Sequence, residues 1–299
     1  MVREVVEALR PEGGGWFVDC TLGMGGHGRA ILEAGASAYL LGLDRDADAL
    51  RLAAERLSET PGRFRALHAN FKDVDRWAPL LPEAPAGILV DLGMSGYQLK
   101  SGRGFSFHDA SALDMRMDPS GGESARDLLN TLPEKDLARL LRTYGEEPFA
   151  GRIARAICRE RLSAPLEDAA TLARIVEEAV PAAAKGRLHP ATRTFQALRI
   201  AVNRELEGLG EFLERAVGLL AGGGRLVVLA YHSLEDRTVK ETFRRLSRGC
   251  VCPPRLPACA CGRSPVTDLP HRKALRPTPA EVSANPASRS ARLRVAVKR

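Results

Sequence analysis

The chain has 299 residues, of which 44% are hydrophobic and 27% are charged, a composition typical of a globular protein. This composition excludes a collagen-like, low-complexity or wholly disordered chain, and the apolar runs are too short to cross a bilayer. The net charge of +7 lies entirely in residues 271–299, which hold eight Lys/Arg and one acid, whereas the other residues carry 36 bases and 36 acids. A neutral body with a basic end is typical of a polyanion-binding protein, although a solvated terminus would look the same.

Short β-like runs alternate with helical patterns in the first hundred residues, which predicts parallel βαβ units. The expected strands are residues 16–21, 38–43, 63–69 and 87–90, and a fifth, 225–231, follows a glycine turn. Residues 292–297 alternate basic and apolar side chains and predict a last strand. We expect this basic strand edge, or the loop before it, to contact RNA.

About 130 residues between the fourth and fifth strands carry helical periodicity without a strand pattern. Thr131 and Glu134 have the spacing of a capping box with Pro133 in the first turn, and Gly145 is the expected stop of that helix. Similar apolar stripes follow, and the last one is expected as a long helix through 195–209.

The helical stretch is too long to be one crossover connection, which needs only about a dozen residues. We therefore expect an inserted all-helical domain at 105–205, with a role in RNA recognition, and a discontinuous α/β core formed by 1–104 and 206–299. The N-terminus has no apolar signal-peptide core, so we expect a cytoplasmic protein.

The cysteines comprise two separate residues, Cys20 and Cys158, expected in the core, and one cluster with the spacing C-x-C-x6-C-x-C. Four thiols within twelve residues could close a zinc site, although these pairs are tighter than usual zinc-finger spacings. Disulfides are less expected in a reducing compartment, and thiols without a metal are the simplest alternative. The cluster consists of Cys250, Cys252, Cys259 and Cys261.

A glycine loop, residues 23–28, follows the first strand and opens a helix. It fits the pattern G-x-G-x-x-G, and Asp44 follows at the end of the second strand, where a carboxylate can accept hydrogen bonds from ribose hydroxyls. Nicotinamide enzymes and S-adenosylmethionine methyltransferases share this pattern. Asp19 and Asp91, at the ends of the first and fourth strands, favour the methyltransferase because a carboxylate is a good partner for the cationic methionine end. Each acid taken alone could also be a helix cap.

Several segments in order resemble the MraW/RsmH family, the bacterial 16S rRNA cytosine-N4 methyltransferases. They are Asp19-Cys20-Thr21-Leu22-Gly23-Met24-Gly25-Gly26-His27, Asp91-Leu92-Gly93-Met94-Ser95, Arg103-Gly104-Phe105-Ser106-Phe107, Leu113-Asp114-Met115-Arg116-Met117-Asp118, His189-Pro190-Ala191-Thr192-Arg193-Thr194-Phe195-Gln196 and His232-Ser233-Leu234-Glu235-Asp236-Arg237. The resemblance spans nearly the whole chain, and its later segments are more specific than a glycine loop.

The resemblance implies a Rossmann-like class I S-adenosylmethionine-dependent sheet with an inserted helical domain. It also implies methylation of N4 of a cytidine in the decoding region of 16S rRNA, with the small ribosomal subunit as partner and no membrane or DNA. The family's cofactor contacts fall on Gly25, Gly26, His27, Asp44, Phe71, Asp91 and Gln98. This chain has Gly96-Tyr97 where the family usually has Ser-Pro, and Ala230-Tyr231 where Ser-Phe is usual.

The Asp/Asn-Pro-Pro-Tyr device of many amino-methyltransferases is missing after the fourth strand. Asp114 and His232 are therefore the candidates for positioning the amine or accepting its proton, with a structural histidine as the alternative for His232. We expect phosphate contacts from the arginines at 193, 199, 289 and 292, with a solvated helix face or ion pairs with acids of the insertion as the alternative for the first two. Two other functions stay open at this point, a nicotinamide oxidoreductase and a non-catalytic ribosome-assembly factor that binds S-adenosylmethionine and RNA.

Overall fold

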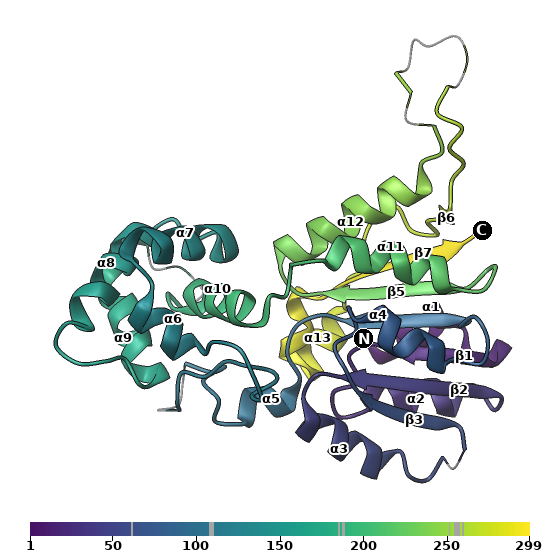
Figure 1. Ribbon diagram of the computed structural model, residues 1–299, viewed down its shortest axis with the longest axis horizontal. Helices are drawn as coiled ribbons and strands as arrows, with labels where there is room; N and C mark the ends of the chain where they lie inside the picture. Colours follow the sequence, from purple (N-terminus) through teal and green to yellow (C-terminus); the bar gives the residue numbers. More distant parts are fainter. Residues whose placement is uncertain are drawn as a thin grey trace. The chain divides into compact units, whose positions relative to one another are not determined.

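The computed structural model describes residues 1–299 except 61, 108–110, 185, 187–188, 251, 254–257 and 259. The chain divides into two compact units: a sheet unit, Met1–Gly93 with Gly208–Arg299, and a helical unit, Met94–Glu207 (Figure 1). The first boundary lies before the predicted residue 105. Residues 94–104 pack with the helical unit because the Met115 amide donates to the Arg103 carbonyl, 2.7 Å away.

The sheet of the sheet unit has the strand order β3-β2-β1-β4-β5-β7-β6. β1 to β5 are parallel, whereas β7 runs antiparallel to both β5 and β6. The strands are β1 (Gly15–Asp19), β2 (Ala38–Asp44), β3 (Phe64–His68), β4 (Gly87–Asp91), β5 (Arg225–Ala230), β6 (Thr267–Asp268) and β7 (Arg292–Lys298). This is the predicted Rossmann-like sheet, and the sequence patterns missed only the two-residue β6 among these strands.

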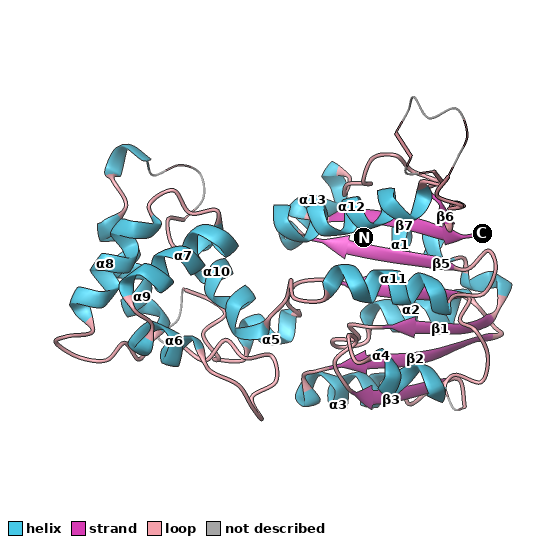
Figure 2. Cartoon of the chain, turned by 45° about the horizontal axis from the view of Figure 1, so that its top comes forward, coloured by secondary structure: helices cyan, strands magenta, loops and turns pink. Residues whose placement is uncertain are grey.

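Helices cover both faces of this sheet (Figure 2). On one face, α1 (Val2–Leu9), α2 (Gly26–Ala34) and α3 (Ala47–Arg56) pack their apolar sides into a core shared with β1 and β2. On the other face, α11 (Leu209–Leu219) packs against both α4 (Val74–Trp77) and α12 (Ser233–Ser247). The short elements are η1 (Pro11–Gly13), η2 (Ala78–Leu80), α13 (Pro279–Ala284) and η4 (Pro286–Ser290).

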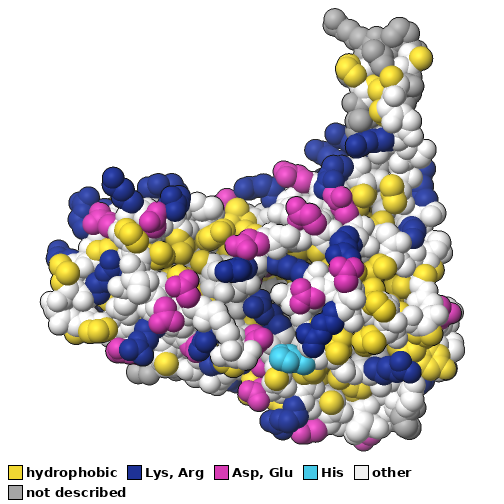
Figure 3. All heavy atoms as spheres, in the orientation of Figure 1, with side chains coloured by type: hydrophobic (Ala, Val, Ile, Leu, Met, Phe, Trp, Pro, Cys, Tyr) yellow, Lys and Arg dark blue, Asp and Glu magenta, His cyan; other side chains and the backbone are white. Residues whose placement is uncertain are grey.

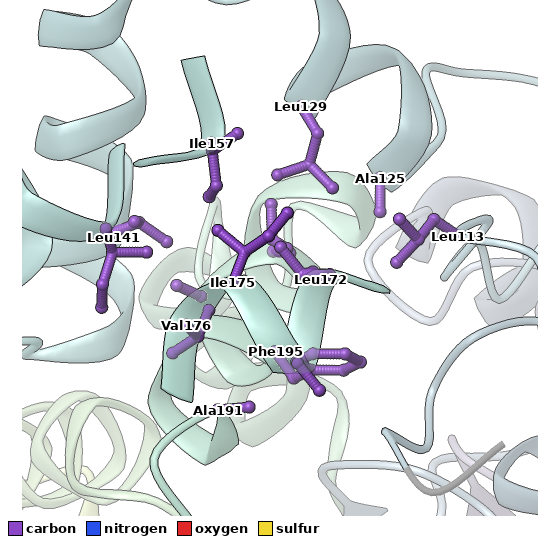
Figure 4. Close-up of a cluster of buried hydrophobic side chains, with 14 of the residues drawn as sticks. Leu113, Ala125, Leu129, Leu141, Ile157, Leu172, Ile175, Val176, Ala191 and Phe195 are labelled. Atoms are coloured by element: carbon purple, nitrogen blue, oxygen red, sulfur yellow. The ribbon is translucent and has the colours of Figure 1, made fainter. Parts of the chain in front are cut away.

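The helical unit has its own apolar core, built where the helices cross (Figure 4). Leu141, Ile157, Leu172 and Val176 are fully buried there, which explains the apolar stripes of the sequence. The helices are α5 (Gly96–Lys100), α6 (Ala125–Thr131), α7 (Glu134–Gly145), α8 (Ala150–Glu160), α9 (Ala169–Ala179), η3 (Ala182–Ala184) and α10 (Thr192–Asn203).

Two predicted helix signals of this unit are wrong in detail. Thr131 does not cap α7: its hydroxyl donates to the Asp127 carbonyl within α6, and Pro133 is the N-cap residue of α7. Gly145 is the last residue of α7, but the left-handed residue that ends the helix is Glu146, with φ 47°. Gly145 serves close packing instead, because a Cβ there would lie 2.6 Å from the Arg193 carbonyl oxygen of α10.

The long helix expected through 195–209 is in fact two helices. α10 ends where Arg204 adopts φ 48°, and α11 begins after Gly208, with φ 65°. The apolar spacing continues across this break, so the periodicity did not reveal it. Among the described residues, no helix is long and apolar enough to cross a membrane.

The basic C-terminal strand forms as predicted, but it is not a sheet edge. β7 lies between β5 and β6, and its Arg292 and Arg294 both bind the carboxylate of Asp236 in α12, at 2.6 and 2.7 Å. These two charges therefore hold α12 to the sheet. The alternation of basic and apolar residues suggested an exposed edge because this local pattern does not reveal Asp236, the acid that pairs with the two arginines.

Candidate active site

Three carboxylates lie at the carboxyl ends of neighbouring strands. Asp44, Asp19 and Asp91 end β2, β1 and β4, which are adjacent in that order in the sheet. The direction of strand succession reverses between β1 and β4, and ligands of open α/β sheets bind at such a reversal. The sequence placed the three acids on strand ends, and the structure brings these ends together.

The glycine loop leads from β1 into α2 and leaves the first amides of that helix without a side-chain cap. Gly25 has φ 78°, and a Cβ at this position would lie 3.2 Å from the side chain of Leu57, the C-cap residue of α3, so only glycine fits without strain. Around Gly26, in contrast, a Cβ would meet nothing within 4 Å. Beside the strand ends, the loop thus exposes the backbone amides at the start of α2, which carry partial positive charge and are not covered by a side chain.

The Asp44 carboxylate organises this loop. Its Oδ2 accepts the Gly23 amide at 2.7 Å, and its Oδ1 accepts the Asp46 amide at 2.8 Å. Burial raises the pKa of Asp44, although both amide hydrogen bonds oppose the shift. Each oxygen keeps lone-pair capacity, so Asp44 can also accept from two vicinal hydroxyls of a ribose.

Asp19 is a buried carboxylate with an unsatisfied oxygen. The residue is 1% exposed, its Oδ1 accepts the Thr21 amide at 3.1 Å, and its Oδ2 has no hydrogen-bond partner among the described residues. Burial raises the pKa of Asp19 to about 7, against the lowering effect of His27. A buried carboxylate that the protein does not satisfy is a site for a cationic ligand group.

Asp91 joins the ends of β4 and β5 through Tyr231. The Tyr231 hydroxyl donates to Asp91 Oδ1 at 2.8 Å. Burial, and after it the charge and hydrogen bond of Asp91, raise the pKa of the tyrosine well above its usual range. His27 Nε2 lies 3.5 Å from Asp91 Oδ2. Tyr231 was noted in the sequence only as a departure from the family, and the adjacency of β4 and β5 is the signal that gives it this contact.

His27 carries the second unsatisfied atom of the site. Its Nδ1 is buried and has no hydrogen-bond partner among the described residues. Burial lowers the pKa of His27, but the hydrogen bond and charge of Asp91 outweigh this effect, and the net pKa is raised. A protonated His27 therefore presents an N–H donor, and its charge interacts favourably with that of Asp19.

The other two residues expected at the cofactor have different surroundings. Phe71 follows β3, and its half-buried ring packs edge-on against Phe212 of α11 with centroids 4.6 Å apart. Gln98 belongs to the helical unit, where its amide and side chain form a capping box with Ser95 at the start of α5. A cofactor role for Gln98 stays a prediction that rests on the family resemblance.

His232 is the N-cap residue of α12. Its Nδ1 accepts the Glu235 amide at 3.4 Å, and its Nε2 lies 3.1 Å from a Glu235 carboxylate oxygen but is buried and has no hydrogen-bond partner among the described residues. This carboxylate also accepts the Tyr231 amide at 3.0 Å. The cap made by Nδ1 favours the structural alternative for His232, whereas Nε2 keeps its capacity for a hydrogen bond.

Asp114, in the helical unit, is bound by Arg116. Both carboxylate oxygens accept from the Arg116 guanidinium at 2.8 Å, and Oδ1 also accepts the Arg116 amide at 2.9 Å. Burial would raise the pKa of Asp114, but these hydrogen bonds outweigh it and the net pKa is lowered. Asp114 is thus a stable carboxylate suited to accepting hydrogen bonds rather than a proton.

The arginines expected to contact phosphates divide into two pairs. Arg199 is buried and forms a bidentate ion pair with Glu205 at 2.8 and 2.9 Å, and Arg292 binds Asp236. For Arg199 the structure therefore favours the alternative, an ion pair with an acid of the helical unit, and a phosphate contact stays an untested prediction. Arg193 and Arg289 are exposed, as expected for a phosphate contact.

The fold and the strand-end site together define the class of protein. A parallel Rossmann-like sheet completed by an antiparallel β7 between β5 and β6, with the acid-lined glycine loop at its switch point, is that of an S-adenosylmethionine-dependent methyltransferase. S-adenosylmethionine is its cofactor, and the nicotinamide oxidoreductase alternative is set aside.

The chain belongs to the MraW methylase family, whose model matches residues 1–299. The ribosomal RNA small subunit methyltransferase H of Pelobacter propionicus is 49% identical over 100% of this chain and 97% of its own length. The protein of the same name from Syntrophotalea carbinolica is 50% identical over 98% of this chain and 95% of its own. A solved rRNA methylase from Streptococcus thermophilus is 11% identical, with a TM-score of 0.41 over 99% of this chain and 93% of its own.

Proposed function

We propose that this protein transfers a methyl group to N4 of a cytidine in the decoding region of 16S rRNA, in the small ribosomal subunit of the cytoplasm. Relatives that are about half identical over the whole chain bear the name of a small-subunit rRNA methyltransferase. This observation is the main support for small-subunit rRNA as the substrate. The strand-end site supports the cofactor half of the reaction.

The amino-acid end of the cofactor is proposed to bind at Asp19 and His27. These residues hold a buried acceptor without a partner and a buried donor without a partner, among the described residues, which is the complement of an ammonium and a carboxylate. The amides of Gly25 and Gly26 lie at the adjacent start of α2. The residues present therefore fit a zwitterionic amino acid.

The nucleoside end is proposed to bind at Asp44, Phe71 and Asp91. Of the two acids expected at the cationic methionine end, only Asp19 is assigned to it, because only Asp19 has a buried oxygen without a partner among the described residues. Asp44 accepts from the ribose hydroxyls, and Phe71 presents a half-buried ring for adenine to pack against. Asp91 is held in place by Tyr231 and can accept from the cofactor with its remaining lone pairs. In the family pattern Gln98 completes the contacts.

When bound, the cofactor supplies an electrophilic methyl group on a sulfonium. The protein must hold the cytosine amine in line with that methyl, because the N4 lone pair is delocalised into the ring. Asp114 suits this task as an ionised acceptor for the amine N–H. His232 serves the same step indirectly, by capping α12 and fixing the chain after β5.

Binding of rRNA is proposed to involve the helical unit and the basic C-terminal stretch. Of the eight bases in 271–299, Arg292, Arg294 and Arg299 bind acids, and Lys298 donates to two backbone carbonyls. The other four are exposed and form no ion pair with another described residue: Arg272, Lys273, Arg276 and Arg289. Figure 3 shows Lys and Arg side chains also over the α7–α8 part of the helical unit.

Phosphate contacts by these four bases have a measurable signature. Replacing all four with methionine should weaken rRNA binding and reduce the slope of log affinity against log salt by roughly 3. Arg51→Met is the matched control, since Arg51 is exposed on α3 but paired with Glu55. An unchanged salt slope in the fourfold variant would show that other residues bind the backbone.

Complementation of a strain that lacks this gene tests the function. Mass spectrometry of 16S rRNA should find N4-methylated cytidine with the wild-type chain and none with Asp19→Asn, because the latter loses the ammonium site. Asp114→Ala should reduce the modification while cofactor binding persists. Restoration of the modified base by Asp19→Asn would contradict the proposed cofactor site, and absence of the base with the wild type would contradict the proposed function.

A further inference from the structure

Three cysteine thiols come together in the loop between α12 and β6, outside the site described above. The Sγ atoms of Cys250, Cys252 and Cys261 lie within 4.8 Å of one another. Cys250 follows the end of α12, and Cys261 lies on the returning part of the loop. The base of the loop is closed by the Val266 amide, which donates to the Leu246 carbonyl at 2.9 Å.

The spacing of the sulfurs matches metal coordination. Cys250 Sγ and Cys261 Sγ are 3.8 Å apart. Two thiolates at about 2.3 Å from a tetrahedral zinc lie about 3.8 Å from each other, whereas a disulfide would bring the sulfurs to about 2.05 Å. The Cys252 amide also donates to Cys250 Sγ at 3.3 Å, which stabilises a thiolate at that position.

The described part of the loop has no apolar core that would hold this arrangement. No described residue between 248 and 266 is buried. A segment that buries so little apolar surface cannot offset the conformational entropy lost on ordering, so such segments are commonly held by a metal or by disulfides. The close approach of the two parts of the loop is also specific, since a Cβ at Gly249 would lie 2.9 Å from the Pro265 ring.

We propose that Cys250, Cys252 and Cys261 bind a structural zinc ion that fixes this loop. Soft thiolate ligands favour zinc over magnesium or calcium. Binding replaces the thiol protons, so three protons leave as three zinc–sulfur bonds form and no oxidant is needed. Cys259, the fourth cysteine of the motif, lies outside the described residues, and the proposal does not depend on it.

Metal analysis of the full-length protein, purified with reductant and without chelator, tests the proposal. About one zinc per chain is expected, and the double variant Cys250→Ser/Cys261→Ser should contain almost none. Cys158→Ser, in the helical unit, is the matched control and should keep its zinc. Cobalt in place of zinc should give the visible bands of a tetrahedral thiolate site in the control but not in the double variant.

Three results would overturn the proposal. They are zinc-free protein that does not take up added zinc, zinc retained by the double variant, and a disulfide between Cys250 and Cys261 in protein alkylated during lysis. If the double variant does not fold, titration of the wild-type thiols with a mercurial should release zinc in step with thiol modification. Release of no zinc in that titration would equally refute the site.

Discussion

Replacing Asp19 by asparagine should make the sheet unit more stable and at the same time remove its affinity for the cofactor. Asp19 is buried, and burial raises its pKa from 3.8 to about 7. A carboxyl group that resists ionisation in the folded state lowers stability as the pH rises, because the unfolded chain loses this proton near pH 4 and the folded chain near pH 7. Asparagine has the same shape and does not ionise.

The size of the effect follows from the two pKa values. A shift of this size costs the wild type about 4 kcal/mol at pH 8 and about 2 kcal/mol at pH 5.5, relative to a side chain that does not titrate. The gain from Asp19→Asn should therefore be about 2 kcal/mol larger at pH 8 than at pH 5.5. This difference is independent of any hydrogen bond that the new amide makes at both pH values.

Urea unfolding followed by tryptophan fluorescence reports on the sheet unit, which contains Asp19, because both tryptophans, Trp16 and Trp77, are buried there. Saturating S-adenosylmethionine should stabilise the wild type, by about 2.7 kcal/mol at a hundred times its Kd, and should leave the variant unchanged. Equal gains at pH 5.5 and pH 8 would refute the buried carboxylate, and full cofactor stabilisation of the variant would refute its binding role.

Three further substitutions test other parts of the structure. Gly25→Ala should lower the unfolding free energy by about 1–3 kcal/mol, because alanine is strained at φ 78°. Gly218→Ala in α11 is the control and should be neutral or stabilising, so equal urea midpoints for the two variants would be inconsistent with the loop geometry. Tyr231→Phe removes the hydroxyl that binds the β4 carboxylate and should lower the unfolding free energy by about 1 kcal/mol, with cofactor binding retained in a calorimetric titration; a complete loss of binding would give the hydroxyl a direct role. Arg199→Met leaves Glu205 without its bidentate partner and should cost about 3 kcal/mol by circular dichroism, so an unchanged melting temperature would argue against the ion pair.

The sheet was predictable from the sequence because its signals are local. Apolar runs ending in Asp19, Asp44 and Asp91 mark strands, and the βαβ spacing forces those strands to be parallel, so their carboxyl ends must share an edge. The expectation of three acids at one edge needed no long-range information. The two-residue β6 lacked any pattern long enough to detect.

The contacts of the charged side chains were not predictable in detail, because the pattern of one element does not say which acid folds back onto it. For Arg199, an ion pair with an acid of the insertion was one of the alternatives, but the sequence did not indicate that the acid is Glu205, just beyond the end of α10. Arg292 looked like an exposed basic residue until α12 supplied Asp236. Periodicity places a residue on a face of its own element but does not say what packs on that face.

Methyl transfer in vitro tests the central claim most directly. The purified protein is incubated with methyl-labelled S-adenosylmethionine and with small ribosomal subunits from a strain that lacks this gene, and the labelled nucleotide is then identified. Label on N4 of a single cytidine of 16S rRNA is the predicted result. Label on another atom or another RNA, or no label on subunits and their assembly precursors while the cofactor still binds, would contradict the account.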